Sequence, residues 1–235
     1  MGTIIVACQT IRHEVNLAIT ETGVHYPVLW IESGLHNFPD RLGQAIQAEI
    51  NKIENVETIL LAFGYCGNSL LGINSSRAQL IIPRVEDCIS LLLGSYERRQ
   101  TLDKEVGTYF LTKGWLENEQ NLLSEYERCV AKYGKDKALK VMKMMLNNYH
   151  RLMVIDNQAY QSEDIVIKTK CFAEALGLNH EIIDGSSRLL KKLLIGLWDD
   201  EFAIIKPGEK VTLEHMLMNN IVEESDHQRV CILSS

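Results

Sequence analysis

Short apolar runs alternate with longer stretches of helical period along most of this chain. Strands of a parallel sheet are buried on both faces, so they appear as continuous runs of Ile, Val and Leu. Their alternation with helices predicts an α/β protein whose mostly parallel sheet is covered by helices on both faces. We expect strands at residues 3–7, 28–31, 58–62, 80–82, 108–111, 152–155, 181–183 and 202–205. We expect helices at about 14–21, 40–52, 85–93, 115–133, 136–148, 163–176 and 188–197.

No repeat, low-complexity tract or linker rich in Pro, Gly and Ser divides the sequence. One α/β domain over residues 1–213 is therefore expected, followed by an acidic tail over 214–235. The helical stretch 115–149 separates the first five expected strands from the last three. A division into two lobes, about 1–114 and 150–213, is thus an open alternative.

The charge balance excludes several classes of partner. A net charge of -7 gives no general attraction to nucleic acid or to anionic membrane surfaces. No stretch reaches the ~20 apolar residues of a membrane span, and no basic region precedes the first apolar run. The six cysteines lack the dense spacing of secreted scaffolds, so we expect reduced thiols and a cytoplasmic location. A chain of this length holds its core without a metal, so any metal is expected to serve chemistry.

Candidate metal ligands follow three of the expected strands. Loops at the carboxyl ends of parallel strands form the ligand crevice of such sheets, and here they contain His36, Cys66 and Cys88. Two thiolates and an imidazole suit zinc or another borderline or soft divalent metal, and they leave a fourth position for water or substrate. Cys8 is a candidate fourth ligand, which would close the site and favour a structural or metal-delivery role. The long gaps are also compatible with cysteines that merely pack as small apolar residues.

Four motifs resemble those of a known family. They are GLH at 34–36, LLAFGYCGN at 60–68, IIPRVEDCI at 81–89 with LLLGS at 91–95, and GTYFLTKGW at 107–115. Their order is similar to that in the family catalogued as domain of unknown function 1638, and the resemblance covers about residues 4–207. Members of that family occur in anaerobic bacteria and methanogenic archaea, often beside genes for corrinoid-dependent methyltransferases. This chain has Glu86 where relatives often have His, so the resemblance implies no proton-transfer role at that position.

The resemblance favours the metal hypothesis and places it in one-carbon or corrinoid-linked metabolism. It implies a corrinoid as a candidate cofactor, with a corrinoid protein or methyltransferase as a partner; a homodimer is common for such chains. We expect a thiol or methyl transferase in which the metal lowers the pKa of a substrate thiol. Asp87 is then expected as a base or ligand partner, Arg84 as a clamp on a substrate carboxylate or phosphate, and Tyr109 or Trp115 as a lid. The candidates for cofactor binding are Gly64, Gly67, Asn68, Thr112, Gly114 and Trp115.

Two other functions use the same residues. Cys66 lies between glycines after an expected strand, where backbone amides can stabilise a thiolate nucleophile. With Cys88 facing it, the pair would suit a metal-free, racemase-like enzyme. The third hypothesis is a carrier that binds a metal, a corrinoid or a small ligand without turnover.

Overall fold

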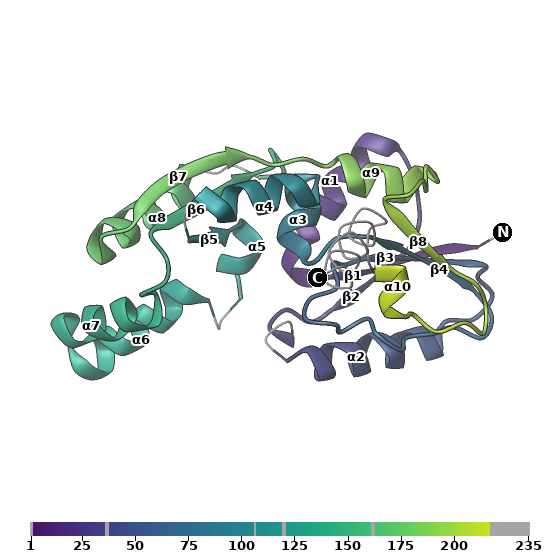
Figure 1. Ribbon diagram of the computed structural model, residues 1–235, viewed down its shortest axis with the longest axis horizontal. Helices are drawn as coiled ribbons and strands as arrows, with labels where there is room; N and C mark the ends of the chain where they lie inside the picture. Colours follow the sequence, from purple (N-terminus) through teal and green to yellow (C-terminus); the bar gives the residue numbers. More distant parts are fainter. Residues whose placement is uncertain (1, 36–37, 106, 119–120, 161–162, 217–235) are drawn as a thin grey trace, which may run out of the picture.

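The computed structural model describes residues 2–35, 38–105, 107–118, 121–160 and 163–216. The described residues form two mostly parallel sheets flanked by helices, which confirms the predicted α/β class (Figure 1). His36 lies outside them, so its position as a metal ligand stays a prediction.

The first sheet contains five strands in the order β2-β1-β3-β4-β8. Four of them run parallel, and β8 is antiparallel to β4. Helix α2 lies on one face, while α1 and α9 pack together on the other (Figure 1). The strands are β1 (Thr3–Cys8), β2 (Val28–Ile31), β3 (Thr58–Ala62), β4 (Gln79–Pro83) and β8 (Phe202–Ile205). The helical segments are η1 (Gln9–Ile11), α1 (Arg12–Thr22), α2 (Pro39–Lys52), α9 (Arg188–Ile195) and α10 (Leu213–Met216).

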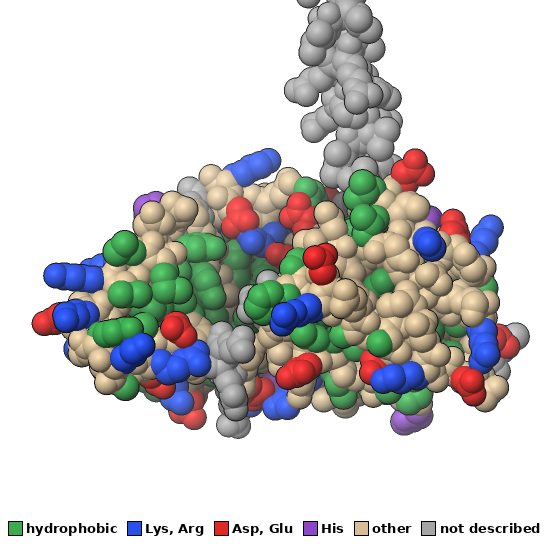
Figure 2. Space-filling model, turned by 90° about the horizontal axis from the view of Figure 1, so that it is seen from below, with side chains coloured by type: hydrophobic (Ala, Val, Ile, Leu, Met, Phe, Trp, Pro, Cys, Tyr) green, Lys and Arg blue, Asp and Glu red, His purple; other side chains and the backbone are tan. Residues whose placement is uncertain are grey.

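The second sheet contains three parallel strands in the order β5-β6-β7. Alternate residues of its central strand enter different cores: Leu152 and Val154 pack toward the helices α6 to α8, whereas Met153 and Ile155 pack with α3 and α4. The strands are β5 (Thr108–Leu111), β6 (Arg151–Asp156) and β7 (Asn179–Asp184). The helices are α3 (Cys88–Leu93), α4 (Tyr96–Glu105), α5 (Lys113–Leu116), α6 (Leu122–Tyr133), α7 (Lys135–Met145) and α8 (Glu163–Leu176). Figure 2 shows apolar side chains gathered on the surface over α6 and α7, where Met144 and Met145 are exposed.

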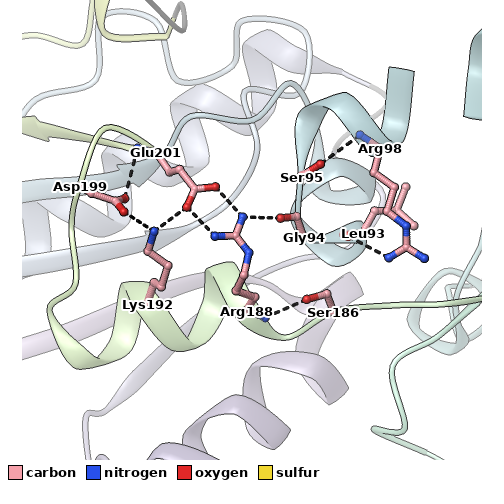
Figure 3. A network of polar contacts seen from close by, with 9 residues as sticks. All are labelled: Leu93, Gly94, Ser95, Arg98, Ser186, Arg188, Lys192, Asp199 and Glu201. Carbon is pink, nitrogen blue, oxygen red and sulfur yellow. Dashed lines mark hydrogen bonds and ion pairs between the residues drawn. The ribbon is translucent and has the colours of Figure 1, made fainter. Parts of the chain in front are cut away.

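A polar network fastens the connection between the two sheets (Figure 3). Arg188 of α9 donates to both carboxylate oxygens of Glu201, at 2.5 and 2.6 Å, and to the Gly94 carbonyl at 2.6 Å. Lys192 of the same helix pairs with Glu201 and Asp199. Because Gly94 directly follows α3, these contacts fix the end of the helix that begins at Cys88.

The sheets do not follow the alternative division into lobes at about 1–114 and 150–213. β5 pairs with β6 in the second sheet, and β8 returns to the first sheet beside β4.

Two expected helices also differ from the observed ones, for a local reason. The Asn121 side chain accepts from the Ser124 amide at 2.9 Å, so the stretch 115–133 divides into α5 and α6. Asp87 caps α3 in the same way, so that helix begins at Cys88 rather than at residue 85. Helix α4 was not expected.

Candidate thiol site

A cavity of about 290 Å³ opens at the carboxyl edge of the first sheet. Cys8 reaches it from the end of β1, Cys66 from the loop after β3, and Cys88 from the start of α3. Its other walls are mainly apolar and include Phe63, Leu42, Ile89 and Trp115. The cavity therefore brings together the three cysteines that the sequence placed at strand ends.

The loops that carry Cys66 and Cys88 are bound to each other by their backbones. The Tyr65 amide donates to the Val85 carbonyl at 3.0 Å, and the Cys66 amide donates to the Glu86 carbonyl at 2.8 Å. A Cβ atom at Gly64 would lie 2.2 Å from the Asp87 carbonyl carbon, so only glycine allows this approach. Cys66 itself has φ 40°, a conformation uncommon outside glycine. The result is an Sγ–Sγ distance of 3.9 Å between Cys66 and Cys88.

The three thiols differ in acidity. The pKa of Cys66 is lowered, mainly by a hydrogen bond from the Cys88 thiol and also by the backbone amides of Cys88 and Gly64. Burial and the charge of Asp87 act in the opposite direction. Donation of its proton to Cys66, together with burial, raises the pKa of Cys88. Burial also raises the pKa of Cys8, against hydrogen bonds from Thr10. Cys66 is therefore the first of the three to ionise.

Asp87 lines the cavity, but its carboxylate already has partners. Oδ1 accepts from the Ser90 amide at 2.8 Å and from the Ser90 hydroxyl at 3.1 Å. Oδ2 lies 3.8 Å from Nε of Arg99, which also pairs with Asp103. Arg99 stacks over the Phe110 ring as well, at 4.3 Å from its centre. These contacts account for Asp87 as a helix cap and an ion-pair partner.

The second sheet supplies one wall of the cavity through Trp115. A Cβ atom at Gly114 would lie 1.7 Å from the Thr10 carbonyl oxygen, so glycine lets α5 approach the end of β1. The neighbouring Trp115 packs against all three apolar cores. Trp115 therefore forms part of the cavity wall, and its role as a lid stays a prediction.

Most of the other predicted site residues lie away from the cavity lining. Tyr109 packs against Tyr149, with ring centres 5.3 Å apart, in the core beneath the second sheet. Asn68 lines a separate groove of about 410 Å³ beside α2. Arg84 pairs its backbone amide with the Glu201 carbonyl at 2.8 Å and is not a cavity-lining residue. Gly67 lines the cavity, whereas Gly64, Gly114 and the buried Thr112 support its walls without lining it.

Glu14 is a buried titratable residue that the sequence did not indicate. Its side chain is 0% exposed, and neither carboxylate oxygen has a hydrogen-bond partner among the described residues. Burial raises the pKa of Glu14 to about 7, with a smaller contribution from Glu117. It interacts electrostatically with Tyr160, whose hydroxyl donates to the Ile155 carbonyl at 2.9 Å. Glu14 follows the cavity-lining Thr10 by four residues but is not itself among the residues that line the cavity.

Over the described part of the chain, no group of three or more His, Cys, Asp or Glu side chains is close enough together to hold a metal ion. The same part of the chain contains no helix that is both long and apolar enough to span a bilayer.

Fold and site together define a parallel α/β protein with a thiol-lined cavity at the carboxyl edge of its main sheet. Residues 30–194 match the family described as protein of unknown function, DUF1638, and the chain belongs to that family. The matched region contains Cys66, Cys88 and Trp115, while Cys8 precedes it. No curated protein and no solved structure matches the chain.

Proposed function

We propose that the protein binds a borderline or soft divalent metal ion, such as zinc, through Cys66 and Cys88 and activates a small thiol there for group transfer. The observation that carries this proposal is the Sγ–Sγ distance of 3.9 Å. Zinc–thiolate bonds of about 2.3 Å in tetrahedral geometry place two sulfurs about 3.8 Å apart. The free pair thus already has nearly the separation that a shared ion requires.

Further ligands are available at the same cavity. Cys8 lines it and is the candidate third ligand among the described residues, but the three thiols do not lie close enough together to share an ion, so the Cys8 side chain would have to move toward the pair. His36 remains the alternative third ligand. With either one bound, a position is left for substrate, as in catalytic zinc sites.

The cavity favours a small substrate. Its volume of about 290 Å³ is near the lower end of the range for small-molecule sites, about 300–1,000 Å³. A metal with thiolate ligands would lower the pKa of a bound substrate thiol. That thiolate could then attack a methyl group, forming the S–CH₃ bond while the bond between methyl and its leaving group breaks and the leaving group keeps the electron pair. A corrinoid ring is larger than the cavity, so a corrinoid donor would be presented by a partner protein at the cavity mouth.

Metal analysis of the anaerobically purified chain tests the proposal. We expect about one equivalent of metal in the wild type, loss of most of it in both Cys66→Ser and Cys88→Ser, and retention in Cys171→Ser. Cys171 is the matched control because it is an exposed cysteine on α8. Metal that stays bound in both site variants would contradict the proposal.

The second candidate is a metal-free enzyme with Cys66 as its nucleophile. The lowered pKa of Cys66 and the backbone amides beside it favour this function. A racemase-like arrangement of this pair is disfavoured, because a carbon between two sulfurs, each about 3–3.5 Å away, needs a wider separation than 3.9 Å. A metal-free wild type in which iodoacetamide alkylates Cys66 much faster than Cys8 would favour this candidate over the first.

A further inference from the structure

The pair Cys66 and Cys88 has a second chemical capacity, which depends on the distance between the two sulfurs. The Sγ atoms lie 3.9 Å apart without an intervening atom. A disulfide bond joins sulfurs at about 2.05 Å and requires Cβ atoms about 3.5–4.5 Å apart. The two loops already approach each other closely enough for their amides and carbonyls to bond.

Backbone contacts keep this approach in place. The hydrogen bond from the Cys66 amide to the Glu86 carbonyl and the contact of Gly64 with Asp87 hold one loop against the other. Bringing the sulfurs together therefore requires mainly rotation of the two side chains. Cys129 lies 3.9 Å from a Glu125 oxygen, and Cys171 is exposed on a helix. Cys8 lines the same cavity and is therefore the one described competitor for Cys66.

We infer that Cys66 and Cys88 form a reversible disulfide when the protein is exposed to a peroxide. Cys66 is partly exposed at the cavity, whereas Cys88 is only 6% exposed, so the oxidant reaches Cys66 first. The Cys66 thiolate attacks one oxygen of hydrogen peroxide, which gives a sulfenic acid and releases hydroxide. The sulfur of Cys88 then attacks the Cys66 sulfur and displaces the hydroxyl group as water. In sum, two thiols and one hydrogen peroxide give one disulfide and two waters.

The disulfide would occupy both sulfurs that the proposed function assigns to the metal. This consequence rests on that proposed function, whereas formation of the disulfide does not. Oxidation would thus inactivate the metal site, and a dithiol reductant would restore it. The bond would be reversible because a thiolate that enters the cavity can attack Cys66.

Thiol titration and peptide mapping of the full chain test the inference. The reduced protein is treated anaerobically with one equivalent of hydrogen peroxide, denatured and titrated for free thiols. We expect the count to fall from six to about four in the wild type, and the mapped disulfide to join Cys66 to Cys88. The count in Cys171→Ser should fall by two as well, whereas Cys88→Ser should form no intramolecular disulfide at Cys66. A disulfide from Cys66 to Cys8, or unchanged thiols in the wild type, would overturn the inference.

Metal uptake before oxidation, after it and after reduction separates the two proposals. If the disulfide forms and the reduced protein binds no metal, the proposed function fails and the disulfide stands. If the reduced protein binds metal and no bond between Cys66 and Cys88 forms, the inference fails and the metal site stands. We expect metal binding in the reduced protein, its loss by at least about tenfold on oxidation, and its recovery on reduction.

Discussion

The carboxyl edges of the two sheets differ in the side chains that they bring together. At the first edge, the loops after β1 and β3 and the start of α3 surround a cavity of about 290 Å³ lined by three thiols. At the second edge, the loops after β6 and β7 close on one another and on α3. The Gly185 amide donates to the Asp156 carbonyl at 2.7 Å, and the Ser186 amide donates to the Leu92 carbonyl at 2.7 Å.

This difference teaches that parallel topology alone does not make a site. Both edges follow the rule that loops gather at the carboxyl ends of parallel strands. The second edge uses its loops to dock against α3 and α4, where Arg98 also donates to the Asp184 carbonyl at 2.7 Å. The second edge also has open volume, a groove of about 300 Å³ lined by α5, α6 and the start of α8, but no cysteine is among the residues that line it. Trp115 is the contribution of the second sheet to the thiol-lined cavity.

Replacing the glycine at each edge should produce the largest contrast. We expect Gly64→Ala to lower the free energy of unfolding by at least about 4 kcal/mol, because its Cβ would collide with the Asp87 backbone. Gly185→Ala should cost about 2 kcal/mol, because the nearest atoms belong to the side chain of Asn157, which can rotate. Urea denaturation followed by circular dichroism measures both. Equal losses would remove the distinction between a backbone and a side-chain contact.

Glu14 of α1 interacts with Glu117 and Tyr160, which follow strands of the second sheet. Its ionisation should lower the free energy of unfolding. The pKa of about 7 is above its ordinary value of 4.5, so the folded state binds the proton more tightly than the unfolded state. The resulting stabilisation is largely present near pH 5 and is lost as pH rises through 7. Relative to Glu14→Gln, the wild type should therefore lose about 2–3 kcal/mol between pH 5 and pH 8.

Denaturation of wild type and Glu14→Gln at several pH values measures this dependence. Glu54→Gln is the control, because Glu54 is exposed and pairs with Arg77. A gap between wild type and Glu14→Gln that stays constant across this range would contradict a buried, titrating Glu14.

Removing Trp115 should open the first edge without altering its thiols. We expect Trp115→Ala to cost about 2 kcal/mol, because the indole is partly buried among all three cores. Alkylation of Cys66 by iodoacetamide should become about tenfold faster, since one wall of the cavity is lost. Trp30→Ala is the control, as Trp30 is exposed on β2. Unchanged alkylation in Trp115→Ala would show that the second sheet does not restrict access.

We expect the smallest change in stability when the N-terminal cap of a helix is replaced, and each of the two regions offers one such cap. Asp87 caps α3 and Asn121 caps α6, each through a hydrogen bond to the amide three residues later. Alanine at either position should cost about 1 kcal/mol, and Asp87→Asn should stay within about 0.5 kcal/mol of wild type. If Asp87→Asn changed stability little but abolished group-transfer activity, Asp87 would have a chemical role beyond the cap.

Much of the fold could be predicted from local patterns. All eight expected strands appear among the described residues with bounds that differ by at most two residues. Most of them are buried and parallel, and such strands are continuous apolar runs. Sheet membership could not be predicted in this way. Nothing in the apolar run at 202–205 distinguishes a strand that follows β7 from one that returns beside β4.

The sequence predicted the cysteines of the candidate site but not all of the charged residues near it. Cys8, Cys66 and Cys88 could be placed together because each follows a strand expected in one parallel sheet. Glu14 and Arg99 could not be found, because a charged residue in a helix has no local pattern that shows burial or a distant partner. Tyr109 was a site candidate because it belongs to the motif GTYFLTKGW at 107–115. Its side chain nevertheless packs in the core of the second sheet.

By itself, the sequence determined where the chain forms strands and helices and which reactive groups follow each strand, because these properties depend on neighbouring residues. The tertiary structure decided which strands share a sheet, which edge holds the thiol-lined cavity and which sulfurs lie 3.9 Å apart. These depend on contacts such as Gly64 against Asp87 and Gly114 against Thr10, where the absence of a side chain sets the distance between segments remote in sequence.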